Sequence, residues 1–259
     1  MRILLLENPA RPIPENARAD FERLLASHAV ERREVPQKRP RRKPVFEADL
    51  IIAAGGDGTV LAAAHYARGR GVPILGFNVG HVGFLAGITL DDFRTELPHL
   101  LEGRWRIEAR TSLRVELPNN RSGWALNETS LQIAGPGIFA ASVCFGTQHV
   151  SDFRGDGLVV STSTGSTAYN FLLGGPLLAP GSSLISITPK NPLPSAFSVV
   201  PEHPPTLPAS KVQRFGFTCS IARDAAPYSS ETSKTPRSRA DCGPCSTAWP
   251  KPERSGRTR

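Results

Sequence analysis

The stretch from residue 48 to residue 62 constrains the fold more than any other part of the chain. An apolar run, residues 48–54, leads directly into Gly55-Gly56-Asp57-Gly58-Thr59, and a helix-like segment follows. This order predicts a buried strand, a glycine turn and a helix start with one carboxylate at its tip. Glycines in such a turn let backbone N–H groups approach phosphate oxygens without interference from Cβ atoms. The stretch therefore predicts a phosphate-handling enzyme, with Asp57 placed for a phosphoryl acceptor or a metal ion. The alternative is a plain strand–helix turn in which Thr59 caps the helix.

Apolar spacing predicts that strands and helices alternate over the first part of the chain. The predicted ranges are strand 3–7, helix 15–28, strand 48–54, helix 59–68 and strand 72–76. The basic, proline-containing stretch 31–45 predicts a loop. This alternation is typical of a parallel α/β sheet, whose phosphate ligands bind beyond the carboxyl ends of the strands.

The pattern changes after about residue 104, where the segments become short, β-rich and bounded by turns. The segments concerned are 111–117, 124–134, 138–149 and 157–163. They predict a second, largely antiparallel β domain. We therefore expect an α/β lobe over residues 1–104, a β lobe over 105–201, and an irregular or disordered Pro/Arg/Ser-rich tail over 202–259.

Composition limits the partners and the compartment. The net charge of +8 would suit an anionic ligand or nucleic acid, but no aromatic interleaving or zinc-finger spacing supports nucleic-acid binding. The apolar run at residues 3–6 is too short for a signal peptide, and no stretch is long enough to span a membrane. These features predict a cytoplasmic protein with free thiols. Cys242 and Cys245 have the spacing of a thioredoxin-type redox site but lack its strand–helix setting.

Two further clusters carry polar groups into apolar surroundings. Asn127 and Glu128 interrupt an apolar strand pattern. One interpretation is that they bind hydroxyls or a carboxamide by hydrogen bonds. The other is that they mark a strand end whose polar residues face water. The stretch 155–170 contains Gly155-Asp156-Gly157, a buried strand, and a turn of small residues and hydroxyls that ends at Tyr169. The small residues of this turn would let a ligand approach the backbone closely, and the Tyr169 ring could stack against a nucleotide base. The plainer interpretation is a Ser/Thr-rich loop.

Taken together, these clusters resemble the NAD kinase family, in order and over roughly residues 1–190. Gly-Gly-Asp-Gly-Thr alone is shared with diacylglycerol and sphingosine kinases. The Asn-Glu pair, the sequence Thr-Gly-Ser-Thr-Ala-Tyr over 164–169 and the glycine-rich stretch 76–85 make the resemblance specific. It implies an α/β N-terminal lobe with a parallel sheet, a β-sandwich C-terminal lobe, and homodimers or homotetramers. It also implies phosphorylation of the adenosine-ribose 2′-hydroxyl of NAD, with ATP or polyphosphate as donor and a divalent cation, Mg²⁺.

The resemblance also assigns site residues. Asp57 matches the family's catalytic aspartate, while Gly55, Gly56, Gly58 and Thr59 form the phosphate turn around it. The residues matched to NAD binding are Asn127, Glu128, Asp156, Thr167, Ala168, Tyr169 and Asn170, with Arg154 and Phe84 at positions that also approach the ligand. No residue is assigned to the metal, which we expect to arrive with ATP.

The chemistry agrees with this assignment. A sugar hydroxyl is a poor nucleophile at neutral pH, and an aspartate carboxylate can accept its proton. Positioning and charge neutralisation dominate phosphoryl transfer, so the glycine backbone and Mg²⁺ would hold the triphosphate. Asp57 could instead help to place the metal.

The chain departs from the family at two places. Ser163 stands where the family usually has proline, which loosens that turn. After about residue 201 no match remains, and a reading-frame change in the gene is one hypothesis, which sequencing of the coding region would test. An incomplete β lobe would give the alternative of a catalytically weakened NAD(P)-binding protein.

Overall fold

The computed structural model describes residues 1–36, 44–80, 83–117, 121–133, 137–145 and 148–193. It divides into two compact units, one of residues 1–109 and one that begins at Arg110. Each unit is described here by itself. The tail after residue 193, with the predicted disorder and the Cys242–Cys245 pair, lies outside the described residues.

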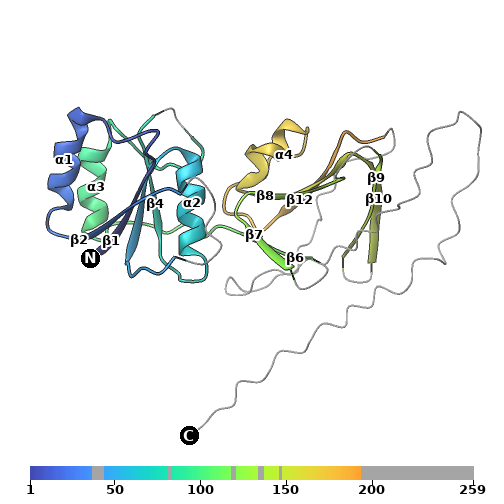
Figure 1. The fold of residues 1–259 in the computed structure, drawn as a ribbon, viewed down its shortest axis with the longest axis horizontal. Coiled ribbons are helices and arrows are strands. Elements are labelled where there is room, and N and C mark those ends of the chain that lie inside the picture. Colours follow the sequence, from blue (N-terminus) through green and yellow to red (C-terminus); the bar gives the residue numbers. More distant parts are fainter. Residues whose placement is uncertain (37–43, 81–82, 118–120, 134–136, 146–147, 194–259) are drawn as a thin grey trace, which may run out of the picture. The chain divides into compact units, whose positions relative to one another are not determined.

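The first unit is a five-stranded parallel sheet with helices on both faces (Figure 1). Its strands, in sheet order, are β2 (Ala29–Glu34), β1 (Arg2–Glu7), β3 (Leu50–Gly55), β4 (Ile74–Asn78) and β5 (Ile88–Thr89). Its helices are α1 (Glu15–Leu25), α2 (Asp57–Ala67) and α3 (Phe93–Leu101). The predicted α/β architecture of this part of the chain is confirmed.

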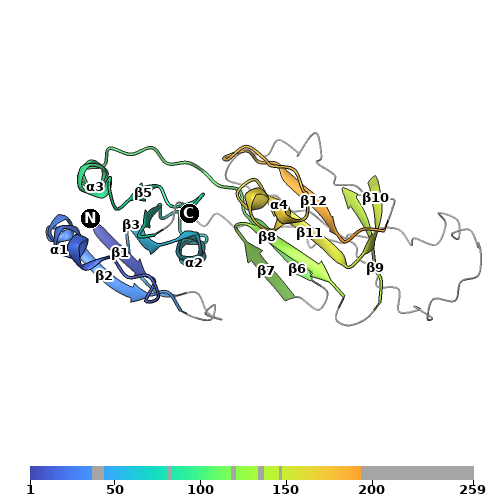
Figure 2. The same ribbon diagram turned by 90° about the horizontal axis from the view of Figure 1, so that it is seen from above.

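Alternation along the central strands decides which helix covers which face. Ile3 and Leu5 of β1 join α1 and α3 in one buried cluster, whereas Leu4 and Leu6 join α2 in another. Figure 2 shows α1 and α3 on one side of the sheet and α2 on the other. Because both faces are covered, β1 and β3 read as continuous apolar runs. Phe21 of α1 stacks on Phe77 of β4 with 5.0 Å between ring centroids.

Two predictions for this unit were wrong in detail. Residues 31–34 do not form a loop, because β2 runs from Ala29 to Glu34 as an edge strand, where charged side chains can face water. The first helix ends at Leu25 rather than at residue 28. Helix α3 was not predicted; Phe93 and Leu97 bury its inner face although Pro98 interrupts its sequence pattern.

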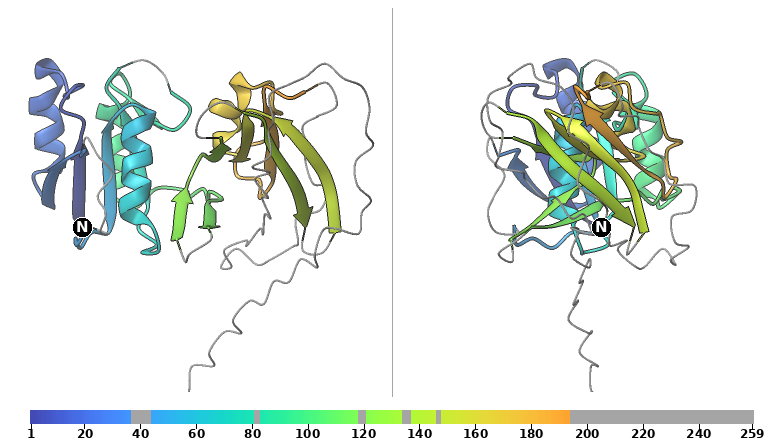
Figure 3. Two further views of the ribbon diagram at one scale, coloured as in Figure 1. Left: turned by 45° about the vertical axis from the view of Figure 1, so that its right-hand side comes forward. Right: turned by 90° about the vertical axis from the view of Figure 1, so that its right-hand side faces the viewer.

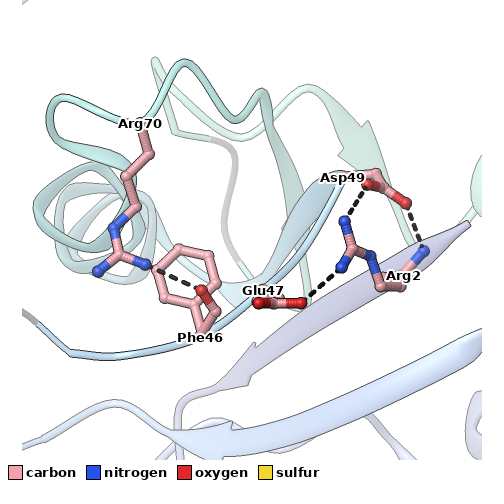
Figure 4. A network of polar contacts seen from close by, with 5 residues as sticks. All are labelled: Arg2, Phe46, Glu47, Asp49 and Arg70. Atoms are coloured by element: carbon pink, nitrogen blue, oxygen red, sulfur yellow. Dashed lines mark hydrogen bonds and ion pairs between the residues drawn. The ribbon is translucent and has the colours of Figure 1, made fainter.

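Side chains anchor the segment that leads into β3 (Figure 4). Arg2 donates to Glu47 at 2.7 Å and to Asp49 at 3.2 Å, and its backbone N–H also donates to Asp49. The two hydrogen bonds from Arg2 to Asp49, the backbone one first, lower the pKa of Asp49. On the other side Arg70 lies over the Phe46 ring at 4.4 Å and donates to the Phe46 carbonyl. The entry to β3, the strand that leads to Asp57, is therefore fixed at both sides.

The second unit consists of antiparallel strands around one core. Its strands are β6 (Leu113–Leu117), β7 (Arg121–Ala125), β8 (Glu128–Gln132), β9 (Phe139–Phe145), β10 (Gln148–Gly155), β11 (Gly157–Thr162) and β12 (Ile185–Lys190). They pair as β6–β7, β9–β10 and β12–β11–β8. Figure 3 shows the long β9–β10 hairpin. Phe139, Phe153, Val160 and Ile187 bring side chains from different sheets into the core, and the predicted β lobe is confirmed.

Two predicted segments each contain parts of two strands. The range 124–134 contains the end of β7 and all of β8, with Asn127 in the turn between them. The range 138–149 covers β9 and only the start of β10. A short helical region, the 3-10 turn Gly165–Thr167 and α4 (Tyr169–Leu172), follows β11. Within the described residues, no helix is long and apolar enough to cross a membrane.

Candidate functional site

Asp57 is the first residue of α2 and lies just beyond the carboxyl end of β3. Its two carboxylate oxygens accept hydrogen bonds from the backbone N–H groups of Phe84 at 2.9 Å and Leu85 at 3.0 Å. A Cβ on Gly83 would stand 2.2 Å from Asp57 Oδ1, so only glycine fits there. The glycine-rich stretch after β4 is thus held against the Asp57 carboxylate, while the Phe84 ring remains 74% exposed.

The glycine turn brings backbone donors to the same place. Gly56 is the N-cap of α2, and Thr59 lies inside the helix that begins at Asp57. The predicted alternative of Thr59 as the cap is therefore wrong. Gly58 is exposed and a Cβ there would meet nothing within 4 Å. The first N–H groups of a helix have no intrahelical partner and favour anions. The turn therefore offers donors on its open side and a carboxylate on its other side.

The second unit joins Asn127 to the Ser/Thr-rich turn. The backbone N–H of Thr162 donates to the Asn127 carbonyl at 2.8 Å, and the Thr162 hydroxyl donates to the Leu126 carbonyl at 2.6 Å. A Cβ on Gly165 would stand 2.3 Å from the Asn127 carbonyl oxygen, which explains glycine at that position. Asn127 Oδ1 is buried and accepts no hydrogen bond from the described residues. A buried acceptor without a donor indicates a place for a ligand donor.

Asn170 differs from the other residues predicted to bind NAD because both its amide nitrogen and its amide oxygen are hydrogen-bonded inside the unit. Its Nδ2 donates to the carbonyls of Ser166 and Pro176, and its Oδ1 accepts from the hydroxyls of Ser186 and Thr188. The residue is 0% exposed. Asn170 therefore fixes the turn from behind and offers no free polar atom to a ligand in this structure. Thr167, Ala168 and Tyr169, immediately before it, are partly exposed.

Arg154 and Asp156 lie at the other end of β11. In the pairing of β11 with β8, Gly157 faces Gln132 while Ser161 faces Glu128. Six steps along the strand therefore separate Asp156 from Thr162, whose N–H bonds the Asn127 carbonyl, a distance on the order of 20 Å. Arg154 is exposed, and Asp156 accepts a hydrogen bond from Asn191 at 2.7 Å. The structure thus places the residues of this unit that were predicted to bind NAD near the two ends of β11.

Sequence reasoning missed the residues that support the turn. Ser186 and Thr188 are buried hydroxyls on β12, and the signal for them was a polar residue at every second position of an apolar strand. Ser163, at the position where proline was expected, donates its hydroxyl to the Ser182 carbonyl at 2.9 Å. This bond restrains the turn in place of a proline ring.

Family models match both units of the chain. The model described as the ATP-NAD kinase N-terminal domain matches residues 14–105, and the ATP-NAD kinase C-terminal domain matches residues 126–203. The NAD kinase of Corynebacterium diphtheriae is 40% identical over 180 residues, which are 63% of this chain and 57% of that protein. The NAD kinase of Mycobacterium bovis is 42% identical over 149 residues, 55% of this chain and 48% of that protein. The chain thus aligns with about half the length of such curated relatives.

Solved structures agree on the fold. The yeast NADH kinase complexed with NADH superposes with a TM-score of 0.64 at 21% identity, covering 77% of this chain and 69% of that one. An NAD kinase from Archaeoglobus fulgidus in complex with ATP gives a TM-score of 0.57 at 25% identity, covering 77% and 76%. The two domain models together cover more than half of the sequence, in the order of the two units. The chain belongs to the NAD kinase family.

Proposed function

We propose that the protein transfers the terminal phosphoryl group of ATP to the 2′-hydroxyl of the adenosine ribose of NAD. The observation that carries the proposal is the Asp57 carboxylate at the glycine turn, beside the open N-terminus of α2. Each carboxylate oxygen has a second lone pair, so the two backbone hydrogen bonds leave Asp57 able to accept a proton. In this proposal Asp57 takes the hydroxyl proton and the turn around Gly56 and Gly58 binds the donor phosphates.

The second unit supplies the proposed contacts to NAD. Asn127, with its unpartnered buried Oδ1, and Glu128 bind hydroxyl or amide groups of the dinucleotide. Thr167, Ala168 and Tyr169 line the exposed side of the turn that Asn170 fixes. Asn170, which the sequence placed in contact with NAD, acts here by holding this turn. Phe84, Arg154 and Asp156 remain proposed ligand contacts.

Mg²⁺ enters this proposal as part of the Mg²⁺-ATP substrate. Among the described residues, no three His, Cys, Asp or Glu side chains are grouped as a metal site would require. Triphosphate oxygens and water, which Mg²⁺ prefers, would therefore supply most of its ligands. A cytoplasmic location and a homodimer or homotetramer also belong to the proposal. The first is supported by the cysteine usage of the sequence and the second by the family resemblance.

The test is formation of NADP from NAD and Mg²⁺-ATP by the full chain, followed with an NADP-specific dehydrogenase. Polyphosphate in place of ATP, and NADH in place of NAD, define the donor and acceptor. Linear NADP production that requires both substrates supports the proposal. A folded chain that binds NAD by calorimetry but forms no NADP would favour the second candidate, a catalytically weakened NAD(P)-binding protein. The loss of family resemblance after about residue 201 of the sequence favours that candidate.

A further inference from the structure

Arg11 is fixed at the carboxyl edge of the parallel sheet by the turn that follows β1. The Asn8 backbone N–H donates to the Ala54 carbonyl of β3 at 3.1 Å, which ties the turn to the neighbouring strand. Asn8 Oδ1 accepts from the Ala10 N–H, and the Asn8 carbonyl accepts from the Arg11 N–H at 2.9 Å. Ile13, two residues later, is buried. The backbone that carries Arg11 is therefore held on both sides of the residue.

The guanidinium of Arg11 lies over the glycines that end two neighbouring strands. Its Nη1 is 3.4 Å from the position that a Cβ on Gly56 would occupy, and 3.9 Å from the corresponding position on Gly80. Gly56 follows β3 and Gly80 follows β4, and these strands pair in the sheet. A Cβ at Gly56 would make an ordinary van der Waals contact with the guanidinium. The positive charge thus stands over the same turn as the N-terminus of α2.

Arg11 has no acidic partner among the residues that the structure describes. Other arginines of this unit do: Arg2 pairs with Asp49, Arg18 with Glu7 and Arg94 with Asp20. Asp57, the carboxylate of the adjoining turn, accepts backbone N–H groups and forms no ion pair with Arg11. An exposed arginine in water is the plain alternative, and Arg106 is such a residue. Arg11 differs from Arg106 in its fixed backbone and in its position over the glycine turn.

A second observation points to a ligand at this turn. Thr59 is 1% exposed, and its Oγ1 has no hydrogen-bond partner among the described residues. That oxygen lies 2.1 Å from the position that a Cβ on Gly55 would occupy, so it faces the turn itself. Buried hydroxyls are normally hydrogen-bonded. Within the part of the chain that the structure describes, the turn therefore combines a helix N-terminus, a buried hydroxyl without a hydrogen-bond partner and a guanidinium without an acidic partner, and all three can donate to anionic oxygens.

We propose that Arg11 binds the polyphosphate chain of the phosphoryl donor. This inference rests on the proposed function and adds to it a residue outside the motifs that the sequence singled out. A guanidinium presents paired N–H groups that match two phosphate oxygens, which a lysine ammonium does not. Arg11 would draw the donor phosphates toward the α2 N-terminus and neutralise part of their charge. It contacts the donor and not NAD.

The experiment compares Arg11→Gln with Arg106→Gln, which removes the same charge from an exposed arginine of the same unit. Calorimetry with inorganic tripolyphosphate and with Mg²⁺-ATP measures binding, and steady-state kinetics give KM for ATP and for NAD. We expect Arg11→Gln to weaken tripolyphosphate binding and to raise KM for ATP by about 10- to 100-fold, the range for a charge-assisted contact. KM for NAD and thermal unfolding should not change. Arg106→Gln should match the wild type, and Arg11→Lys should recover only part of the loss.

The outcomes separate this inference from the proposed function. If the wild type forms NADP and Arg11→Gln leaves KM for ATP unchanged, the role of Arg11 is refuted and the activity stands. If the wild type forms no NADP but binds tripolyphosphate in an Arg11-dependent way, the activity fails and the anion site stands. A wild-type chain that binds neither tripolyphosphate nor Mg²⁺-ATP overturns the inference.

Discussion

The carboxylate of Asp57 accepts a hydrogen bond from the backbone N–H of Phe84, 27 residues further along the chain. This bond and its neighbour from Leu85 join the start of α2 to the stretch after β4. Asp57 therefore has a structural task as well as the proposed chemical one. Loss of activity on changing Asp57 is informative only when the position of this stretch is measured at the same time.

Gly83→Ala should displace the stretch after β4, because the added methyl would stand 2.2 Å from Asp57 Oδ1. We expect a large loss of NADP formation, together with altered amide chemical shifts at Phe84 and Leu85. Gly87→Ala is the matched control, since a Cβ there meets nothing within 4 Å. Equal activity of the two variants would show that the contact between Gly83 and Asp57 does not matter.

Gly58→Ala tests whether phosphates approach the backbone of the turn. The site is open, and alanine is a better helix former than glycine, so the free energy of unfolding should stay the same or rise by up to about 1 kcal/mol. KM for ATP should nevertheless increase, because the methyl group occupies the space where phosphate oxygens would lie. Unchanged kinetics with ATP would contradict phosphate binding at this position.

Asn170→Ala should destabilise the second unit. It removes the acceptor of the Ser186 and Thr188 hydroxyls and the donor to the Ser166 and Pro176 carbonyls, all inside the protein. Buried groups left without partners cost about 1–3 kcal/mol each, so a loss of about 3 kcal/mol or more is expected in urea unfolding. The exposed Gln132→Ala serves as control and should cost less than about 0.5 kcal/mol. A loss for Asn170→Ala no greater than the control's would mean that Asn170 does not hold the turn.

The pKa of Asp152 is lowered by hydrogen bonds from the Ser142 hydroxyl and, second, from His149. A carboxyl with a lowered pKa in the folded state adds stability above its unfolded pKa, near 3.9, and loses it as the pH falls through the folded value. Asp152 is largely exposed, so the effect on stability is small and its carboxyl titration by NMR is the better measurement. Ser142→Ala should raise the pKa of Asp152 toward 3.9. No change on this substitution would exclude the hydroxyl as the main cause.

The sequence predicted the parts of the fold whose pattern is strong and local. The strands β1 and β3 could be predicted because burial on both faces leaves them few polar residues. The glycine turn Gly55–Thr59 could be predicted because it directly follows the apolar run of β3. The sequence predicted a loop over most of the charged edge strand β2, because an edge strand tolerates the same residues as a loop. Helix α3 was missed because Pro98 breaks its pattern although Phe93 and Leu97 bury its inner face.

The motifs of the candidate site could be predicted from the sequence, but the hydrogen bonds that join them could not. Nothing local links Asp57 to Phe84, or Asn170 to Ser186, because these contacts depend on how distant strands and turns are brought together. For the same reason the position of Arg11 was not predicted. Arg11 shares no motif with Gly56 or Gly80 and approaches them only through the pairing of β1, β3 and β4. Asn170 was predicted to contact NAD, but its amide is hydrogen-bonded inside the protein.

The central claim is tested most directly by NADP formation from NAD and Mg²⁺-ATP with the wild-type chain beside Asp57→Asn. Calorimetric binding of NAD and the amide shifts of Phe84 and Leu85 are measured on both proteins. The account predicts that NAD binding persists while turnover falls by about 10²–10⁴-fold, the range for loss of a general base. If Asp57→Asn binds NAD and turns over at a rate near that of the wild type, Asp57 is not the catalytic base and the account is wrong.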